Sequence, residues 1–387
     1  MCQKLIEMTK KLRNPFVLVG DIPAEYFCDR VEETKKIIRT ISNESNIVLM
    51  SPRRIGKSRL VRHCFIQPEI ADNYYTFYID LLHTSSIREL TYTFGLTVFN
   101  TLKSRSQKAA LSLMQTLKSM AGTFGFDAVS GMPTFTLEVG RVATPVFTLA
   151  EIFEWLNKAD KPCLVCFDEF QQVYYYPENK HGEVEALLRG HIQNIRGTNF
   201  VFSGSERHML LEMFTDQAKP FYNSADIMSL NPIDPEIYCD FACRWFREYG
   251  KNLERSAIRR YYDILEGATY YLQKLMHEAF INCENGETCG NDMLMFTLDS
   301  IIEEASDGFR KRLGSLTERQ KEALNAIARE GRAEKVLSIA FIKKYALAST
   351  SVMQSSLKRL LEEGLISQSG NTYYLTDVLH RLILLRL

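Results

Sequence analysis

The stretch "NIVLMSPRRIGKSRLVRHCF", residues 46–65, decides the fold of this chain. Its first five residues are a mostly apolar run of strand length, and residues 59–65 have the apolar spacing of a helix. A short basic loop that contains Gly-Lys-Ser joins the two. A strand, a tight loop and a helix in this order begin a crossover unit, so the stretch predicts a parallel sheet.

The loop has the residues of a phosphate-binding loop. Backbone N–H groups from such a loop and from the helix behind it converge on phosphate oxygens. Gly56 lets the backbone approach the phosphates, Lys57 can reach the β- and γ-phosphates, and the Ser58 hydroxyl can join the ligand shell of Mg²⁺. Ser51 stands where the pattern usually has glycine, which a small polar residue can replace if its φ stays negative. The alternative is a coincidental Gly-Lys-Ser before a surface helix.

A second motif, "KPCLVCFDEFQQV" at residues 161–173, is an apolar strand that ends in two carboxylates. Charges at the end of a buried strand are costly unless a cation meets them. We expect Asp168 to hold Mg²⁺ through water opposite Ser58, and Glu169 to polarise the water that attacks a γ-phosphate. Glu169, Asp168 and Lys57 are therefore the candidate catalytic residues. The alternative is that the two acids cap the next helix.

A third strand, in "NFVFSGSERHML", ends in Ser203, Gly204 and Ser205. If this strand neighbours the Asp168 strand, the hydroxyls of Ser203 and Ser205 could contact the γ-phosphate or its water. The alternative is that they form a turn, as serines at strand ends commonly do.

Strands and helices alternate over the first 233 residues. Apolar runs of strand length lie at residues 46–50, 74–82, 163–167, 199–202 and 227–230, and helical spacing lies at 59–65, 87–103, 149–158 and 184–196. This alternation predicts an α/β fold with a mostly parallel sheet covered on both faces. Residues 124–144 alternate apolar and polar residues around Gly and Pro, which predicts an inserted hairpin.

The strand signal stops after residue 233. Pro232 and Pro235 mark the boundary, and residues 234–305 have the spacing of consecutive helices. Residues 306–387 change character again, with two helices followed by a third and by a pair of short strands. We therefore expect three domains: an α/β core at 1–233, an all-α segment at 234–305, and a winged helix-turn-helix at 306–387.

The third helix of the C-terminal segment is a candidate nucleic-acid contact. Ser349 or Thr350 can cap it, and Gly364 can end it before a wing that turns near residue 370. Its open face would present side chains that hydrogen-bond base edges or phosphates, namely Ser351, Gln354, Ser355, Lys358 and Arg359.

The charge distribution points to the same segment. The net charge of the chain is zero, but residues 310–387 hold 14 Lys and Arg against 7 Asp and Glu. An anionic partner such as double-stranded DNA is one interpretation of this surplus. The other is that the domain packs against the rest of the chain or against another protein.

The composition limits the class of protein. A length of 387 residues allows two or three domains, and 45% hydrophobic with 24% charged residues is typical of a soluble globular chain. No apolar run reaches the roughly 18 residues of a membrane-spanning helix, and no signal peptide is evident. The nine cysteines are scattered, and the Cys-x-x-Cys at Cys163 and Cys166 is expected to be buried and inert. A reducing cytoplasm is therefore the expected compartment.

Together these motifs resemble the archaeal-type ATPase family within the STAND class of AAA+ P-loop (ASCE) NTPases, over roughly residues 14–280. "SPRRIGKS" resembles the family's loop, in which Ser at the first position is tolerated, and "FCDRVEE" resembles its N-terminal box. "DEFQQV" and "FSGSERHML" match its second-strand and sensor motifs. "GATYYLQ" matches its lid motif, although Thr269 stands where proline is usual.

The resemblance implies ATP or ADP with Mg²⁺ as cofactors, bound between the α/β core and a helical lid. The residues that it places near the nucleotide are Phe27, Arg30, Pro52, Arg53, Arg54, Ile55, Gly56, Lys57, Ser58, Arg59, Ser203, Ser205, Gly267 and Tyr270.

The leading functional hypothesis is an ATP-hydrolysing molecular switch whose winged helix couples nucleotide state to DNA or to a protein partner, with an oligomer as an option. One alternative is a nucleotide-bound transcription regulator that scarcely hydrolyses ATP. Another is a defence or toxin–antitoxin component that acts through a protein partner.

Overall fold

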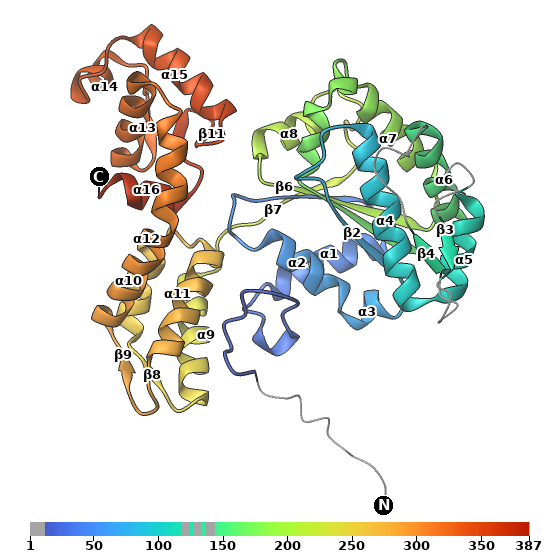
Figure 1. Cartoon of the computed structure of the whole chain (residues 1–387), viewed down its shortest axis with the longest axis horizontal. Helices are drawn as coiled ribbons and strands as arrows, with labels where there is room; N and C mark the ends of the chain where they lie inside the picture. Colours follow the sequence, from blue (N-terminus) through green and yellow to red (C-terminus); the bar gives the residue numbers. More distant parts are fainter. Residues whose placement is uncertain (1–11, 118–123, 127–132, 136–143, 387) are drawn as a thin grey trace, which may run out of the picture. The chain divides into compact units, whose positions relative to one another are not determined.

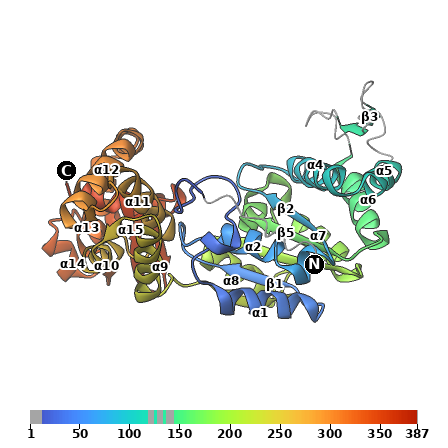
Figure 2. The ribbon, with the colours of Figure 1, turned by 90° about the horizontal axis from the view of Figure 1, so that it is seen from below.

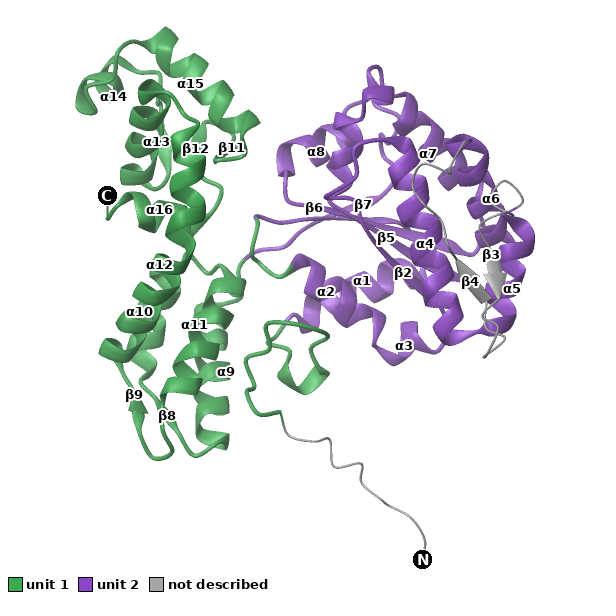
Figure 3. Ribbon diagram, viewed as in Figure 1, with its two compact units in different colours: residues 1–29, 53–56, 232–387 green, residues 30–52, 57–231 purple. Residues whose placement is uncertain are grey.

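The computed structural model describes residues 12–117, 124–126, 133–135 and 144–386 (Figure 1). The chain forms two compact units, coloured separately in Figure 3. Unit 2 comprises residues 30–52 and 57–231. Unit 1 comprises residues 1–29, the four-residue tip 53–56 of the basic loop, and residues 232–387.

Unit 2 is built on a five-stranded parallel sheet, as the sequence predicts. Its strands in spatial order are β2 (Tyr75–Asp80), β5 (Cys163–Asp168), β6 (Thr198–Gly204), β1 (Ile47–Met50) and β7 (Asp226–Ser229). Helices flank this sheet on both sides (Figure 2). They are α1 (Val31–Ser42), α2 (Lys57–Phe65), α3 (Pro68–Ala71), α4 (Ile87–Arg105), α5 (Gln107–Thr116), α6 (Pro145–Lys158), α7 (Glu183–Asn194) and α8 (Arg207–Thr215).

The strand order determines which chain segments meet at the carboxyl edge of the sheet. β6 lies between β1 and β5, so Ser203 pairs with Leu49 on one side and with Asp168 on the other. Asp168 in turn pairs with Asp80 at the end of β2. Three loops that are far apart in the sequence therefore begin side by side.

The interior of unit 2 is aromatic and closely packed. Phe167 on β5 and Phe202 on β6 both contact Phe170, which begins the 3-10 turn η4 (Phe170–Tyr175). A second such turn, η5 (Pro177–Asn179), follows. Cys163 and Cys166 are completely buried on β5 and unpaired, and burial raises the pKa of both thiols, as expected of inert cysteines.

The predicted inserted hairpin is described only in part. β3 (Phe124–Phe126) and β4 (Pro133–Phe135) pair antiparallel, and the rest of residues 124–143 lies outside the described residues.

The first described element of unit 1 is the 3-10 turn η1 (Ala24–Tyr26), and four helices follow after the loop tip. These are α9 (Pro235–Glu248), α10 (Arg255–Ile264), α11 (Thr269–Asn282) and α12 (Asn291–Gly314), and we call α9 to α12 the lid. Two strands that the sequence analysis missed, β8 (Asn252–Leu253) and β9 (Thr288–Cys289), pair in parallel within the lid. Two residues are too few to produce a detectable period.

The C-terminal part of unit 1 is a winged helix. Its elements are α13 (Glu318–Glu330), β10 (Ala333–Glu334), α14 (Ile339–Lys344), α15 (Thr350–Glu362), β11 (Ile366–Ser369), β12 (Thr372–Leu375) and α16 (Val378–Leu384). Strands β11 and β12 form the wing, and β10 adds a third strand beside β12. The expected division between residues 305 and 306 falls inside α12, the last helix of the lid, which is unbroken at this point.

Among the described residues, no helix combines the length and the apolar character needed to cross a bilayer.

Candidate functional site

A buried cluster of charges lies at the carboxyl edge of the sheet in unit 2. Lys57 is the first residue of α2, directly after the loop that follows β1, and Asp168 is the last residue of β5. The Lys57 ammonium lies 3.1 Å from Asp168 Oδ1 and 2.9 Å from Glu169 Oε1. The lysine side chain is only 6% exposed, so solvent screens these ion pairs weakly.

The Asp168 carboxylate is surrounded by hydrogen-bond donors. Besides Lys57, it accepts hydrogen bonds from the hydroxyls of Ser58 (2.7 Å), Ser203 (2.5 Å) and Tyr78. Burial alone would raise its pKa, but Lys57 and the three hydroxyls outweigh burial and hold the pKa of Asp168 at about 2. Asp168 is therefore an anion at every physiological pH.

Glu169 is fixed from both sides. Its Oε1 accepts from Lys57, and its Oε2 accepts from Gln171 Nε2 (2.6 Å), the Ser205 hydroxyl (2.9 Å) and the Ser205 backbone N–H (3.1 Å). The residue has a left-handed backbone with φ of 54°, which is unusual for a residue other than glycine and is common at functional sites. Burial acts to raise its pKa, but Lys57 and these donors lower it overall.

Lys57 itself carries a stabilised positive charge. Burial lowers the pKa of an ammonium, but the carboxylates of Asp168 and Glu169 more than offset this effect, so the pKa of Lys57 lies above its ordinary value. The structure thus brings together the four residues that the sequence singled out for phosphate, metal and water, and joins Ser203 and Ser205 to them.

Two residues of this cluster were missed by the sequence analysis. Tyr78 lies on β2, next to β5, and donates to Asp168 while the Arg62 guanidinium lies 4.1 Å above its ring. Gln171 lies in η4 and reaches back to Glu169. Tyr78 could have been identified only with the knowledge that β2 pairs with β5. Gln171 could have been identified only with the knowledge of the turn that follows Glu169.

The first half of the loop follows the sequence argument. Ser51 is buried, and its backbone N–H donates to the Gly204 carbonyl at 3.4 Å. Among the described loop residues, positive φ occurs at Arg54 (70°) and Gly56 (96°), and not at Ser51. Serine in place of the first glycine therefore costs no backbone strain. Half-buried Pro52 follows it, and half-buried Arg59 lies in the first turn of α2.

The loop tip contacts other residues of unit 1. The backbone carbonyl of Arg54 accepts a hydrogen bond from Tyr270 N–H (2.9 Å), and the Arg54 guanidinium lies 4.7 Å above the Tyr270 ring and 5.4 Å above the Tyr271 ring. Asp377, which caps α16 of the winged helix, lies 3.8 Å from Arg54 Nε and accepts from the Tyr271 hydroxyl at 2.6 Å. Of the other tip residues, Arg53 is exposed and Ile55 is buried.

The remaining residues that the resemblance implied are anchored in the fold. Arg30 is 4% exposed, and its guanidinium donates to Glu33 (2.8 Å) and to the Asn231 carbonyl (2.7 Å). Phe27 is half-buried at the end of η1. Gly267 has a φ of 69°, and a Cβ there would lie 2.6 Å from the Tyr262 hydroxyl, so close packing requires glycine.

The donors at the edge of the sheet fit a magnesium ion. Mg²⁺ prefers oxygen ligands, keeps several waters and needs one or two protein ligands beside the phosphates of its nucleotide. Ser58 Oγ and Asp168 Oδ2, 2.7 Å apart, can supply these protein ligands. Within the described part of the chain, no group of three or more His, Cys, Asp and Glu side chains could hold a metal ion.

The open face of α15 is solvent-exposed. Ser351, Gln354, Ser355, Lys358 and Arg359 are all exposed, whereas Met353, Ser356, Leu357 and Leu360 are buried. Arg359 forms ion pairs with Glu362 and Glu363 on its own helix, so Lys358 offers the less engaged charge.

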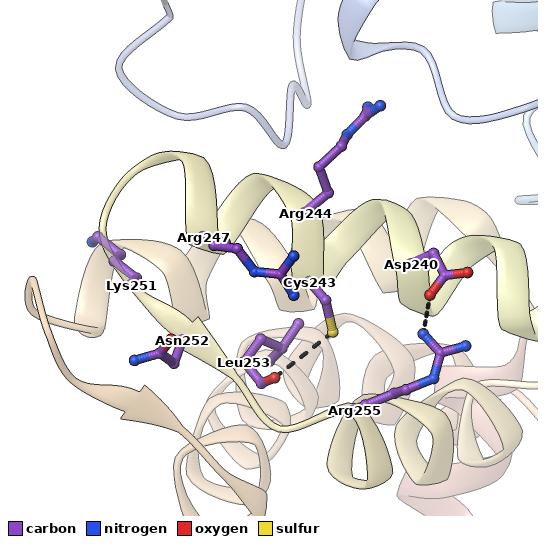
Figure 4. Close-up of a pocket in the computed structure, with 8 residues that line it drawn as sticks. All are labelled: Asp240, Cys243, Arg244, Arg247, Lys251, Asn252, Leu253 and Arg255. Atoms are coloured by element: carbon purple, nitrogen blue, oxygen red, sulfur yellow. Dashed lines mark hydrogen bonds and ion pairs between the residues drawn. The ribbon is translucent and has the colours of Figure 1, made fainter.

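A separate pocket of about 680 Å³ lies in the lid between α9, β8 and α10 (Figure 4). Its lining includes Arg244, Arg247, Lys251 and Arg255. Three of these cations are engaged: Arg255 pairs with Asp240, Arg244 pairs with Glu248 at 4.0 Å, and Lys251 donates to two backbone carbonyls of the lid. The sequence analysis identified none of these residues.

Comparisons with known proteins agree with this architecture. A family model described as an ATPase domain predominantly from Archaea matches residues 27–275, and one described as a probable winged helix domain matches residues 307–386. No curated protein matches the chain.

Three solved structures share the fold at low sequence identity. The Walker-type ATPase of Pyrococcus abyssi is 20% identical, with a TM-score of 0.67 and coverage of 96% of this chain and 100% of that one. The ORC2 protein of Aeropyrum pernix, in ADPNP–ADP complexes, is 13% identical, with a TM-score of 0.60 and coverage of 97% and 98%. The ORC1 protein of the same organism, in complex with DNA, is 12% identical, with a TM-score of 0.50 and coverage of 97% and 96%. The predicted fold, a P-loop NTPase core followed by a helical segment and a winged helix, is confirmed.

Proposed function

We propose, from the premise that this chain belongs to the family of ATPase domains predominantly from Archaea, that it binds and hydrolyses ATP with Mg²⁺ at the carboxyl edge of its parallel sheet. The observation that carries the proposal is the buried cluster of Lys57, Ser58, Asp168 and Glu169. Without a ligand such a cluster would be an expensive way to stabilise a fold, because each charge must be desolvated. ORC2, a structural relative, is in complexes with ADPNP and ADP, which supports an adenine nucleotide.

The roles follow from the contacts. The Lys57 ammonium would move from the two carboxylates to the β- and γ-phosphates of ATP, because a triphosphate offers it more anionic oxygens. Ser58 and Asp168 would hold Mg²⁺, which when bound neutralises phosphate charge. Glu169, released from Lys57 at Oε1, would accept a proton from the attacking water.

Two substitutions test these roles. Lys57→Ala should abolish binding of a fluorescent ATP analogue, whereas Glu169→Gln should retain binding and reduce turnover by roughly 10²- to 10⁴-fold, the usual contribution of a general base. Glu178→Gln, at an exposed acid of η5, is the matched control and should leave turnover unchanged. If Lys57→Ala binds ATP with unchanged affinity, the nucleotide does not bind at this site. If Glu169→Gln retains wild-type turnover, Glu169 has no catalytic role.

The finer proposal is a STAND-type switch in which nucleotide state is relayed to the winged helix. The contact that supports it is the one between Arg54 at the loop tip and Asp377 at the start of α16. Arg54 lies in the proposed phosphate-binding loop and also contacts the winged helix. The binding of phosphate to the loop can therefore change this contact. The competing proposals are a regulator that scarcely hydrolyses ATP and a defence or toxin–antitoxin component that acts through a protein partner.

Double-stranded DNA is the partner that the exposed face of α15 supports. Its polar side chains are solvent-exposed, and ORC1, a relative of the same fold, is in complex with DNA. Lys358→Ala should weaken binding to a mixed-sequence duplex and reduce the dependence of that binding on salt, because one phosphate contact is lost. Lys335→Ala, elsewhere on the winged helix, is the control. Turnover measured with and without duplex separates a DNA-coupled ATPase from a regulator with little hydrolysis, and absence of duplex binding at low salt would favour a protein partner.

A further inference from the structure

Among the described contacts, the side chain of Gln171 forms a hydrogen bond with Glu169 alone. It is 3% exposed, and its Nε2 donates to Glu169 Oε2 at 2.6 Å. The same oxygen accepts from the hydroxyl and the backbone N–H of Ser205. Three donors therefore fix Oε2, whereas Oε1 is held by Lys57 at 2.9 Å.

The other end of the Gln171 amide has no hydrogen-bond partner. Its Oε1 is buried and unsatisfied, although interior amides usually have both ends paired. Rotating the amide by half a turn would place its oxygen against the Glu169 carboxylate, and the two would repel. The orientation of Gln171 is thus determined by Glu169, and the unpaired oxygen is the cost of that arrangement.

Gly204 leaves the room that this amide needs. A Cβ at position 204 would lie 2.0 Å from Gln171 Oε1, far inside van der Waals contact. The glycine at the end of β6 therefore allows the Gln171 amide to lie directly against the strand. Because Ser205 follows at once, β6 supplies both the space for Gln171 and the second donor to Glu169.

We infer that Gln171 is a positioning residue for ATP hydrolysis: with Ser205 it clamps Glu169 Oε2, so that only Oε1 changes its partner from Lys57 to the attacking water. The inference rests on the proposed function, in which Glu169 accepts the proton of that water. The described hydrogen bond of the Gln171 side chain is to Glu169 and not to Lys57, Ser58 or Asp168. Its removal should therefore affect the chemical step and leave nucleotide binding intact.

The test is steady-state kinetics of Gln171→Met, which keeps the length and volume of the side chain and removes the amide. We expect kcat to fall at least tenfold, while KM and the Kd for ATP change less than twofold. Gln172→Met makes the same chemical change one residue later in η4 and should behave as wild type. If Gln171→Met fails to fold, Gln171→Asn keeps the amide but is one methylene too short to reach Glu169, and the same fall in kcat is expected.

A double variant separates positioning from a general structural role. In a Glu169→Gln background, Gln171→Met should cause no further loss of kcat, because the carboxylate that it positions is gone. Multiplicative losses would overturn the inference. So would wild-type kcat in Gln171→Met when Glu169→Gln is slow. Wild-type turnover in Glu169→Gln alone would instead contradict the proposed function on which the inference rests.

Discussion

Lys57 is the residue on which the electrostatics of unit 2 depend. Its ammonium is within 3.1 Å of two carboxylates that burial would otherwise destabilise. Lys57→Met should therefore lower the free energy of unfolding of the nucleotide-free protein by about 3–5 kcal/mol, the usual effect of leaving a buried charge without its partner. Urea unfolding followed by the fluorescence of buried Trp155 in unit 2 measures this loss.

The control is Lys35→Met, because Lys35 forms an exposed ion pair with Glu32 on α1 and should change stability by less than about 1 kcal/mol. Adding Glu169→Gln to Lys57→Met should restore part of the stability, since one of the two uncompensated anions is removed. Equal stability of Lys57→Met and wild type would show that the carboxylates find other partners.

Acid should weaken the same cluster. The pKa of Asp168 is about 2 in the folded chain, below its value near 3.9 in an unfolded one, so its ionised form stabilises the fold above roughly pH 4. This contribution, about 2 kcal/mol, is lost as the pH falls from roughly 4 to 2. The difference in unfolding free energy between wild type and Asp168→Asn should therefore shrink over this range, and a difference that does not change with pH would contradict the assignment.

Site residues that stand in a recognisable motif could be predicted from the sequence. Those whose place in the site depends on which strands pair could not. Lys57, Ser58, Asp168 and Glu169 follow strands in recognisable motifs, so their convergence could be expected from the geometry of a parallel sheet. Tyr78 looks like an ordinary strand tyrosine until β2 is known to lie beside β5. Gln171 looks like a surface residue until the left-handed turn at Glu169 directs the chain back toward β6.

Elements were predicted most reliably where long apolar runs defined them. All five strands of the sheet were found, whereas the starts of α2 and α6 lie two and four residues before the expected helices. Pro145 can begin α6 because a proline in the first turn lacks only an N–H that has no partner there. The passage of α12 across residues 305 and 306 could not be seen, because nothing interrupts its helical spacing.

The cap of α15 gives a prediction at the element scale. The Ser349 hydroxyl accepts from Val352 N–H at 3.3 Å and satisfies one free donor at the helix start. Ser349→Ala should destabilise the first turn by about 1 kcal/mol and accelerate amide hydrogen exchange there roughly fivefold. Ser355→Ala removes a hydroxyl from the middle of the same helix and should leave exchange in the first turn unchanged.

At the scale of the whole molecule, unit 1 joins parts that the sequence presented as separate domains. One continuous hydrophobic cluster includes Phe16, the lid and the winged helix. Tyr271 of α11 also donates to Asp377 at the start of α16. The lid and the winged helix therefore share a core and belong to one compact unit, with the loop tip in contact with both.

In the proposed switch, Asp377 would compete with phosphate for Arg54. Asp377→Asn keeps the oxygen that caps α16 through Leu379 N–H at 3.0 Å, but it removes the negative charge that lies 3.8 Å from Arg54 Nε. A partly exposed pair of this kind is worth up to about 1 kcal/mol, so the Kd for ATP should fall by about two- to fivefold. Titration of a fluorescent ATP analogue measures the change, with Glu318→Gln on the winged helix as the control for lost charge. In an Arg54→Ala background the substitution should have no effect, and a gain in affinity that persists there would place its origin elsewhere than in the contact between loop tip and winged helix.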